Sequence, residues 1–147
     1  MRTAFILRVV VIVLACVGSF EATGQVVDRR QVHAFLTKDK DGSPATTFSD
    51  DVSSIYLIWK GEGLQTGDRI NVVWIAEDVG NASPKESKVG EHSVIVYKSD
   101  EIGSFFVSRP RSRVWPVGRY RTEIYIGKKL VTALRFTIQP GVSIELH

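Results

Sequence analysis

The sequence predicts an all-β protein folded as a single antiparallel β-sandwich of about seven short strands. The clearest observation is an alternation of apolar and polar residues on both sides of a short turn at Gly127-Lys128, which is typical of a β-hairpin. Other β-branched and aromatic runs are separated by segments rich in Gly, Asp, Ser and Pro. No segment after residue 24 shows a convincing helical pattern. A closed β-barrel is the alternative architecture.

Strands are expected where apolar residues alternate or β-branched residues cluster between two turn signals. They are predicted at 31–37, 52–59, 69–77, 93–97, 104–108, 120–126 and 130–138. The polar segments 38–51 and 78–92 are predicted to be loops, and residues 142–146 an edge strand or a tail. In the last hairpin, the predicted inward residues are Tyr120, Thr122, Ile124, Ile126, Leu130, Thr132, Leu134, Phe136 and Ile138.

Residues 1–24 are predicted to be a secretory signal peptide. Arg2 and Arg8 supply the positive charge, and the small residues Ala22 and Gly24 suit a signal peptidase. The apolar run at residues 9–17 is shorter than the roughly 20 residues of a membrane span, although a short uncleaved anchor is the alternative. The remaining chain, residues 25–147, is expected to form one domain that works in the periplasm or outside the cell.

Cys16 is the single cysteine of the chain, so the exported domain has no internal disulfide. Residues 13–16 resemble the lipobox of bacterial lipoproteins, which implies acylation of Cys16 and an anchor at the envelope. Leu14 is larger than the residue this family prefers there. The alternative is that Cys16 is an apolar residue of the signal core. Membrane association is expected only if Cys16 is lipidated.

The charge of the chain is close to balanced. The formal net charge is +3, and removal of Arg2, Arg8 and Glu21 with the signal peptide leaves +2. Such a balance does not suggest a nucleic-acid-binding protein. A chain of roughly 120 residues buries about two-thirds of its unfolded surface, which is enough for one core without disulfides.

Three local features resemble immunoglobulin-like domains. Trp74 lies mid-strand, where such domains place a core tryptophan, and Gly118-Arg119-Tyr120 precedes a strand in the manner of a tyrosine corner. Thr122 stands two residues after Tyr120, where antibody domains carry a cysteine. Because no cysteine is present at either disulfide position, the chain is more similar to fibronectin-III-like and bacterial immunoglobulin-like modules without a disulfide.

No catalytic, cofactor or metal site is predicted. His33 and His92 are far apart in the sequence and show no ligand spacing, and there is no Gly-x-Ser-x-Gly nucleophile motif. Asp39-Lys40-Asp41-Gly42 is interpreted as a solvated turn.

A row of arginines is the candidate partner-binding site. The set of candidate residues is Arg109, Arg111, Arg113, Trp115, Arg119 and Arg121. Alternating residues of an extended segment project to one side, and guanidinium groups bind carboxylate, sulfate or phosphate. An acidic glycan, lipid headgroup or protein surface would fit them. The alternative is that these arginines are the solvent face of a sheet.

The three tryptophans differ in their expected positions. Trp74 is expected in the core. Trp59 and Trp115 are adjacent to turn residues, so they either cap the core or stand exposed, as in β-sandwich modules that bind sugars. The predicted function is a non-catalytic, exported binding or structural module that recognises an envelope or extracellular partner. The alternatives are a carbohydrate-binding accessory domain, a small hydrolase, or a lipoprotein subunit of an envelope complex.

Overall fold

The computed structural model describes residue 24 and residues 26–111 and 113–142. The strands are β1 (Gln31–Thr37), β2 (Thr47–Ser49), β3 (Ser54–Glu62), β4 (Arg69–Asp78), β5 (Ser87–Ile95), β6 (Ile102–Ser108), β7 (Gly118–Ile126) and β8 (Lys129–Gln139). One short 3-10 turn, Gly80–Ala82, follows β4. Cys16, the predicted signal peptide and nearly all of the segment 142–146 lie outside the described residues. Among the described residues, no helix has the length and apolar character to cross a membrane.

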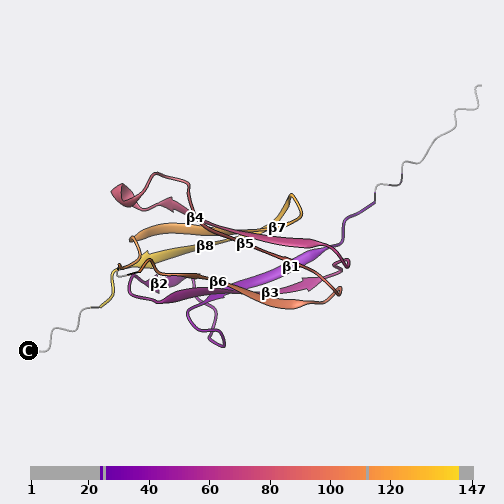
Figure 1. Ribbon diagram of the computed structural model, residues 1–147, viewed down its shortest axis with the longest axis horizontal. Coiled ribbons are helices and arrows are strands. Elements are labelled where there is room, and N and C mark those ends of the chain that lie inside the picture. Colours follow the sequence, from indigo (N-terminus) through magenta and orange to yellow (C-terminus); the bar gives the residue numbers. More distant parts are fainter. Residues whose placement is uncertain (1–23, 25, 112, 143–147) are drawn as a thin grey trace, which may run out of the picture.

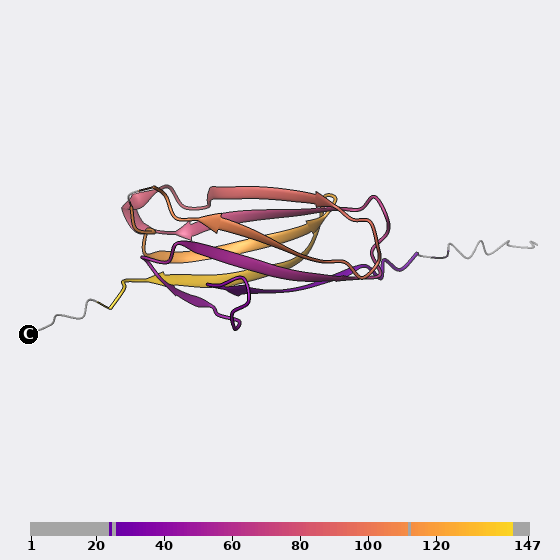
Figure 2. The ribbon, with the colours of Figure 1, turned by 60° about the horizontal axis from the view of Figure 1, so that its bottom comes forward.

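The strands form two sheets that pack as two layers (Figure 1). One sheet has the order β1-β3-β6 and the other has the order β2-β8-β7-β4-β5. The second view shows β6 running beside β3 in the smaller sheet (Figure 2). Two separate sheets confirm the sandwich over the closed barrel. The expected purely antiparallel pairing is wrong at one place, because β2 pairs with β8 in parallel.

Strand β2 lies inside the segment 38–51 that the sequence predicts to be a loop. It is only three residues long, and its central Phe48 is 4% exposed and meets Phe136 of β8 edge to face. One buried aromatic residue between Thr and Ser is too short a pattern to indicate a strand. The pairing with β8 therefore holds residues 47–49 in the strand conformation.

Strand β5 begins at Ser87 rather than at residue 93, so the second predicted loop is shorter than expected. The first part of β5 is polar because it is the outer strand of its sheet, with little of it in the core. Its pairing with β4 shifts register between Trp74 and Ile75. A bulged, polar edge strand lacks the apolar alternation by which strands are recognised.

The β7–β8 hairpin forms as predicted, with one correction. Gly127 has φ 60° in the turn, a conformation that favours glycine. The register shifts between Ile124 and Tyr125, so that Val131 rather than Leu130 packs against the core. Leu130, predicted to face inward, is 49% exposed. The bulge reverses the alternation for the first residues of β8.

The core contains Trp74, Tyr120 and Thr122, the three residues on which the resemblance rests. Trp74 is buried and meets Phe136 edge to face, and Phe136 in turn stacks on Tyr120 with ring centroids 5.2 Å apart. The Tyr120 hydroxyl donates to the carbonyl of Pro116 at 2.5 Å. A tyrosine that bonds back to the backbone a few residues upstream is a tyrosine corner, as predicted. Thr122 is fully buried.

Candidate interaction surfaces

The predicted arginine row is divided between the two sheets. Arg119 and Arg121 lie on β7, in the five-stranded sheet. Arg109 directly follows β6 in the three-stranded sheet, where its backbone N–H donates to the Ser53 carbonyl. Between the two groups, the chain passes through the buried Trp115. The alternation in sequence therefore does not produce one continuous basic face.

Arg121 lies in a cluster of carboxylates on the outer face of the five-stranded sheet. Its guanidinium pairs with Glu123 at 2.8 Å, with Glu86, and with Glu77 at 3.4 Å. Arg135 of β8 also pairs with Glu77, at 3.2 Å. The Arg121 side chain is 20% exposed. An acidic ligand would have to displace these carboxylates, so Arg121 ties β7 to its neighbours rather than offering an open anion site.

The same cluster shifts the titration of its members. Tyr125 donates a 2.5 Å hydrogen bond to Glu123, and together with Arg121 it lowers the pKa of the Glu123 carboxyl. The hydrogen bond that Arg121 donates to Glu123 raises the pKa of the Arg121 guanidinium further above its usual range. Both groups are thus held in their charged forms.

Arg119 also faces a carboxylate. Its guanidinium lies 3.4 Å from Asp78, which also lies 3.6 Å from Lys85. The backbone N–H of Gly80 and the charge of Lys85 lower the pKa of Asp78. Arg119 remains 69% exposed, so this pair is a weak surface interaction.

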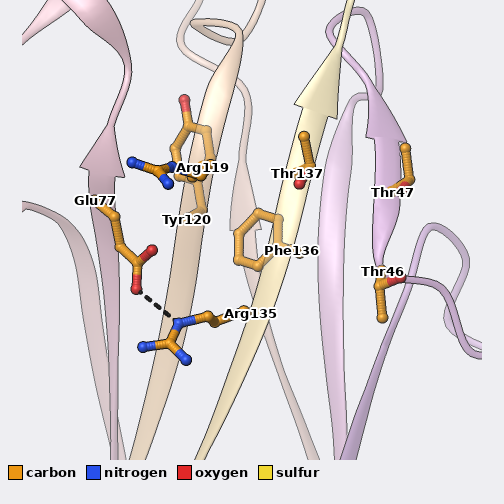
Figure 3. Close-up of a pocket in the computed structure, with 8 residues that line it drawn as sticks. All are labelled: Thr46, Thr47, Glu77, Arg119, Tyr120, Arg135, Phe136 and Thr137. Atoms are coloured by element: carbon orange, nitrogen blue, oxygen red, sulfur yellow. Dashed lines mark hydrogen bonds and ion pairs between the residues drawn. The ribbon is translucent and has the colours of Figure 1, made fainter.

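A shallow hollow of about 270 Å3 lies between Arg119 and Arg135 (Figure 3). Its other lining residues are Thr46, Thr47, Glu77, Tyr120, Phe136 and Thr137. Two of its charged lining residues, Arg135 and Glu77, are joined by the ion pair that the figure marks. The hollow therefore presents a neutralised pair and threonine hydroxyls rather than concentrated positive charge.

Arg109, Arg111 and Arg113 belong to the connection between β6 and β7. The Arg109 guanidinium donates to the backbone carbonyl of Asp51 at 3.0 Å. The acceptor of this hydrogen bond is therefore a neutral group and not a carboxylate. Arg111 and Arg113 are exposed. These three residues are the basic part of the predicted site that lies at the end of the three-stranded sheet.

Trp59 and Trp115 are both buried, so of the two alternatives the core position holds, and Trp115 is not an exposed residue of the predicted binding site. Both indoles are 2% exposed. The Trp115 Nε1 donates to the Val52 carbonyl at 2.8 Å, and the ring meets Tyr120 edge to face. Trp59 stacks on Phe105 with centroids 6.4 Å apart. The two tryptophans therefore act as core residues, and neither provides a platform for sugar rings.

The exposed aromatic surface lies instead on the outer face of the three-stranded sheet, where sequence analysis placed no site. Phe35 of β1 and Phe106 of β6 are 38% and 53% exposed, and Ile102 is 67% exposed. Tyr56 of β3 lies beside Phe106, with ring centroids 5.7 Å apart. Ile58 lies opposite Phe35 in the register. We call these five residues the outer aromatic face.

The sequence contains a signal for this surface. Strand β3 is apolar on both of its faces: Ile55 and Leu57 are fully buried, while Tyr56 and Ile58, which alternate with them, are only partly covered. An exposed sheet face normally alternates polar residues with the inward ones. The neighbouring outward residues are His33 and Lys60, which face each other across β1 and β3.

The two described histidines with side-chain contacts lie on the surface. His33 Nε2 is 3.4 Å from Glu62 Oε2, with the side chains 60% and 52% exposed. Such exposed pairs contribute little. His92 stacks on Phe105, with centroids 6.0 Å apart. Within the described residues, no group of three His, Cys, Asp or Glu side chains is placed to hold a metal ion.

Neither a protein-family model nor a curated protein matches this sequence. Solved structures match its fold. A β-glucosidase from Listeria innocua has a TM-score of 0.51 and 9% identity, over 78% of this chain and 17% of that one. An immunoglobulin-like protein from Pseudomonas aeruginosa has a TM-score of 0.45 and 14% identity, over 76% and 93%.

A Pseudomonas fluorescens alkylpurine DNA glycosylase is similar over 75% of this chain and 30% of its own, at 11% identity and a TM-score of 0.48. The chain thus spans less than a third of each of these two larger enzymes. At such identities the similarity concerns the fold alone. With the two sheets, the core Trp74 and the Tyr120 corner, the chain is an immunoglobulin-like β-sandwich domain.

Proposed function

We propose that this chain is a non-catalytic, exported binding module that recognises an acidic protein of the cell envelope or the extracellular space. The observation that carries the proposal is the outer aromatic face, a cluster of apolar side chains on a sheet face that no described segment covers. Aromatic residues exposed on a rigid sheet supply contact area at a low cost in side-chain entropy.

Basic residues at the margin of the face indicate the charge of the partner. Lys60 is exposed on the outer side of β3, and Arg111 and Arg113 are exposed just beyond the end of β6. Glu62, at the same end of β3 as Lys60, and Asp100 and Glu101, just before β6, are acidic. The basic charge is therefore gathered at the end with Arg111 and Arg113, and an apolar face that is basic at one end is complementary to an apolar patch bordered there by carboxylates. Arg121 is not part of this surface, because its charge is used within its own sheet.

The proposal is tested by capture from envelope extracts with the purified exported protein. Phe106→Ser is expected to lose the partner that the wild type retains, because it removes the half-exposed ring that lies beside Tyr56 in the face. Leu130→Ser is the matched control, since Leu130 is 49% exposed but lies in the other sheet. Equal retention by all three proteins would refute the proposed surface.

The charge of the partner is tested separately. Arg111→Glu combined with Arg113→Glu is expected to weaken capture and to remove its dependence on salt, because the margin then repels carboxylates. Reversal of Arg119 serves as the control on the opposite sheet. If the Arg119 variant lost as much binding as the double variant, the basic residues of β7 would be the binding site instead.

An acidic glycan is a second candidate partner, favoured by the adjacent rings of Tyr56 and Phe106, which are tilted by 38° to one another. Rings on a sheet face can stack on sugar units. Calorimetric titration with acidic and neutral oligosaccharides distinguishes the candidates. Saturable binding of an acidic oligosaccharide that is lost in Phe106→Ser would favour the glycan over the protein.

A further inference from the structure

Strand β6 has an open edge. It is the last strand of its sheet, with β3 on one side only. The Gly61 N–H donates to the Glu101 carbonyl at 2.8 Å and the Arg109 N–H donates to the Ser53 carbonyl at 2.9 Å, so the odd-numbered residues of β6 bond to β3. The backbone N–H and C=O groups of the even-numbered residues point away from β3. These residues are Ile102, Ser104, Phe106 and Ser108. No other segment of the described chain donates a backbone hydrogen bond to them or accepts one.

The other sheet edges are protected against pairing, whereas β6 is not. Strand β5 carries Lys88 and Glu91 and is bulged, and β2 has only three residues. The free side of β1 is partly used, because the Ala45 N–H donates to the Leu36 carbonyl. Strand β6 runs for seven residues without a charge, a proline or a register shift. Such an edge is a template for another strand.

The charges at the two ends of β6 are opposite. Asp100 and Glu101 precede the strand, and Arg109 and Arg111 follow it. Strand β6 itself is uncharged, and its charges lie in the residues that flank it. When two copies of β6 pair antiparallel, the acidic residues at the start of each strand therefore meet the basic residues at the end of the other. The edge is therefore complementary to itself, which is the property that an isologous two-fold interface requires.

We propose that two copies of this chain associate through antiparallel pairing of their β6 strands. The register that uses the full strand places the two-fold axis beside Phe105. Ile102 then lies opposite Ser108 of the second copy, and Glu101 lies opposite its Arg109. Because the even-numbered residues face each other, every free backbone group of β6 gains a partner. The two three-stranded sheets become one continuous sheet.

The surroundings of Phe105 fit this arrangement. Its ring stacks on Trp59 on the core side and on His92 at the margin, and its side chain is only partly buried. In the proposed register, the two Phe105 residues form the close, non-hydrogen-bonded pair at the axis, so each ring covers the other. The interface uses the backbone edge, so it does not depend on the partner proposed for the outer aromatic face.

The backbone pairing is tested with Ser104→Pro. The Ser104 N–H points to the open edge and not to β3, so proline removes one donor of the interface and leaves the β3–β6 ladder intact. We expect sedimentation equilibrium of the purified exported protein to show a dimer that Ser104→Pro weakens by about tenfold or more. Ser104→Thr keeps the N–H and is the matched control, expected to dimerise as the wild type does.

The register is tested by charge exchange. Glu101→Arg and Arg109→Glu each place like charges opposite one another at both ends, and each is expected to weaken the dimer by about tenfold. A mixture of the two variants restores both opposite-charge pairs and is expected to form heterodimers, a result that misfolded variants would not produce. A wild type that stays monomeric at all concentrations overturns the proposal, as does a dimer insensitive to Ser104→Pro or a mixture that stays monomeric.

Discussion

Tyr120 shows how one side chain joins the connection between the sheets to the core. Its ring stacks on Phe136 and its hydroxyl donates to the Pro116 carbonyl, so it holds the end of the β6–β7 connection against the start of β7. Burial raises the pKa of the Tyr120 hydroxyl to about 12. The folded protein therefore resists ionisation of this tyrosine, whereas the unfolded chain ionises it at its ordinary value of 10.0.

This pKa difference predicts a loss of stability at alkaline pH. A folded-state pKa above the unfolded value contributes stability that is complete below about pH 10 and is lost as the pH rises towards 12. Urea unfolding of the wild type and Tyr120→Phe should show a difference of about 1 kcal/mol at pH 7 that shrinks above pH 10. A difference that stayed constant across this range would show that Tyr120 ionises equally in both states.

Trp74 is the residue whose loss should cost the most. The indole is 1% exposed and packs against Phe136, so Trp74→Ala removes a large ring that the neighbours cannot replace. The free energy of unfolding is expected to fall by about 3–5 kcal/mol. Leu130→Ala, at a half-exposed position of β8, should change it by no more than about 0.5 kcal/mol. Thermal melts of the two variants measure the contrast.

At the scale of the strands, the Arg121 cluster joins β4, β7 and β8 to Glu86, the residue just before β5. Arg121→Met keeps most of the aliphatic packing but leaves three carboxylates facing one another, so we expect a loss of about 1–2 kcal/mol in the free energy of unfolding. High salt should reduce this loss by screening the repulsion. Arg119→Met is the matched control, because Arg119 is 69% exposed beside Asp78. Equal losses in both variants would contradict a special role for the cluster.

The strands that the sequence predicted are those with a buried face. The alternation around Gly127 and the run containing Trp74 have this property, and both form strands. Strand β2 and the first half of β5 were missed because their pairing partners, rather than their own composition, make them strands. The bulge beside Val131 was missed because a register shift leaves no mark in the pattern of apolar residues.

At the scale of the molecule, the candidate surfaces depended on contacts that join distant parts of the sequence. Sequence analysis identified Arg121 as part of a basic row, but its partner Glu77 comes from β4 and its partner Glu86 from the residue just before β5. Trp115 was a candidate for an exposed position, but its indole is buried and donates a hydrogen bond to the Val52 carbonyl. The open edge of β6 could not be predicted at all, because strand order is a property of the sheet and not of any one strand.

The parallel pairing of β2 with β8 also has a consequence for when the protein can fold. The Gly141 N–H donates to Asp50 across 91 positions, and Phe48 of β2 packs on Phe136 of β8. Contacts between such distant residues form slowly, and here they need the last strand of the domain. A growing chain that lacks β8 has no Phe136 against which Tyr120 and Phe48 can pack. For a chain that is exported, as we propose, this delay leaves the polypeptide unfolded, and therefore able to cross a membrane, until β8 has been made.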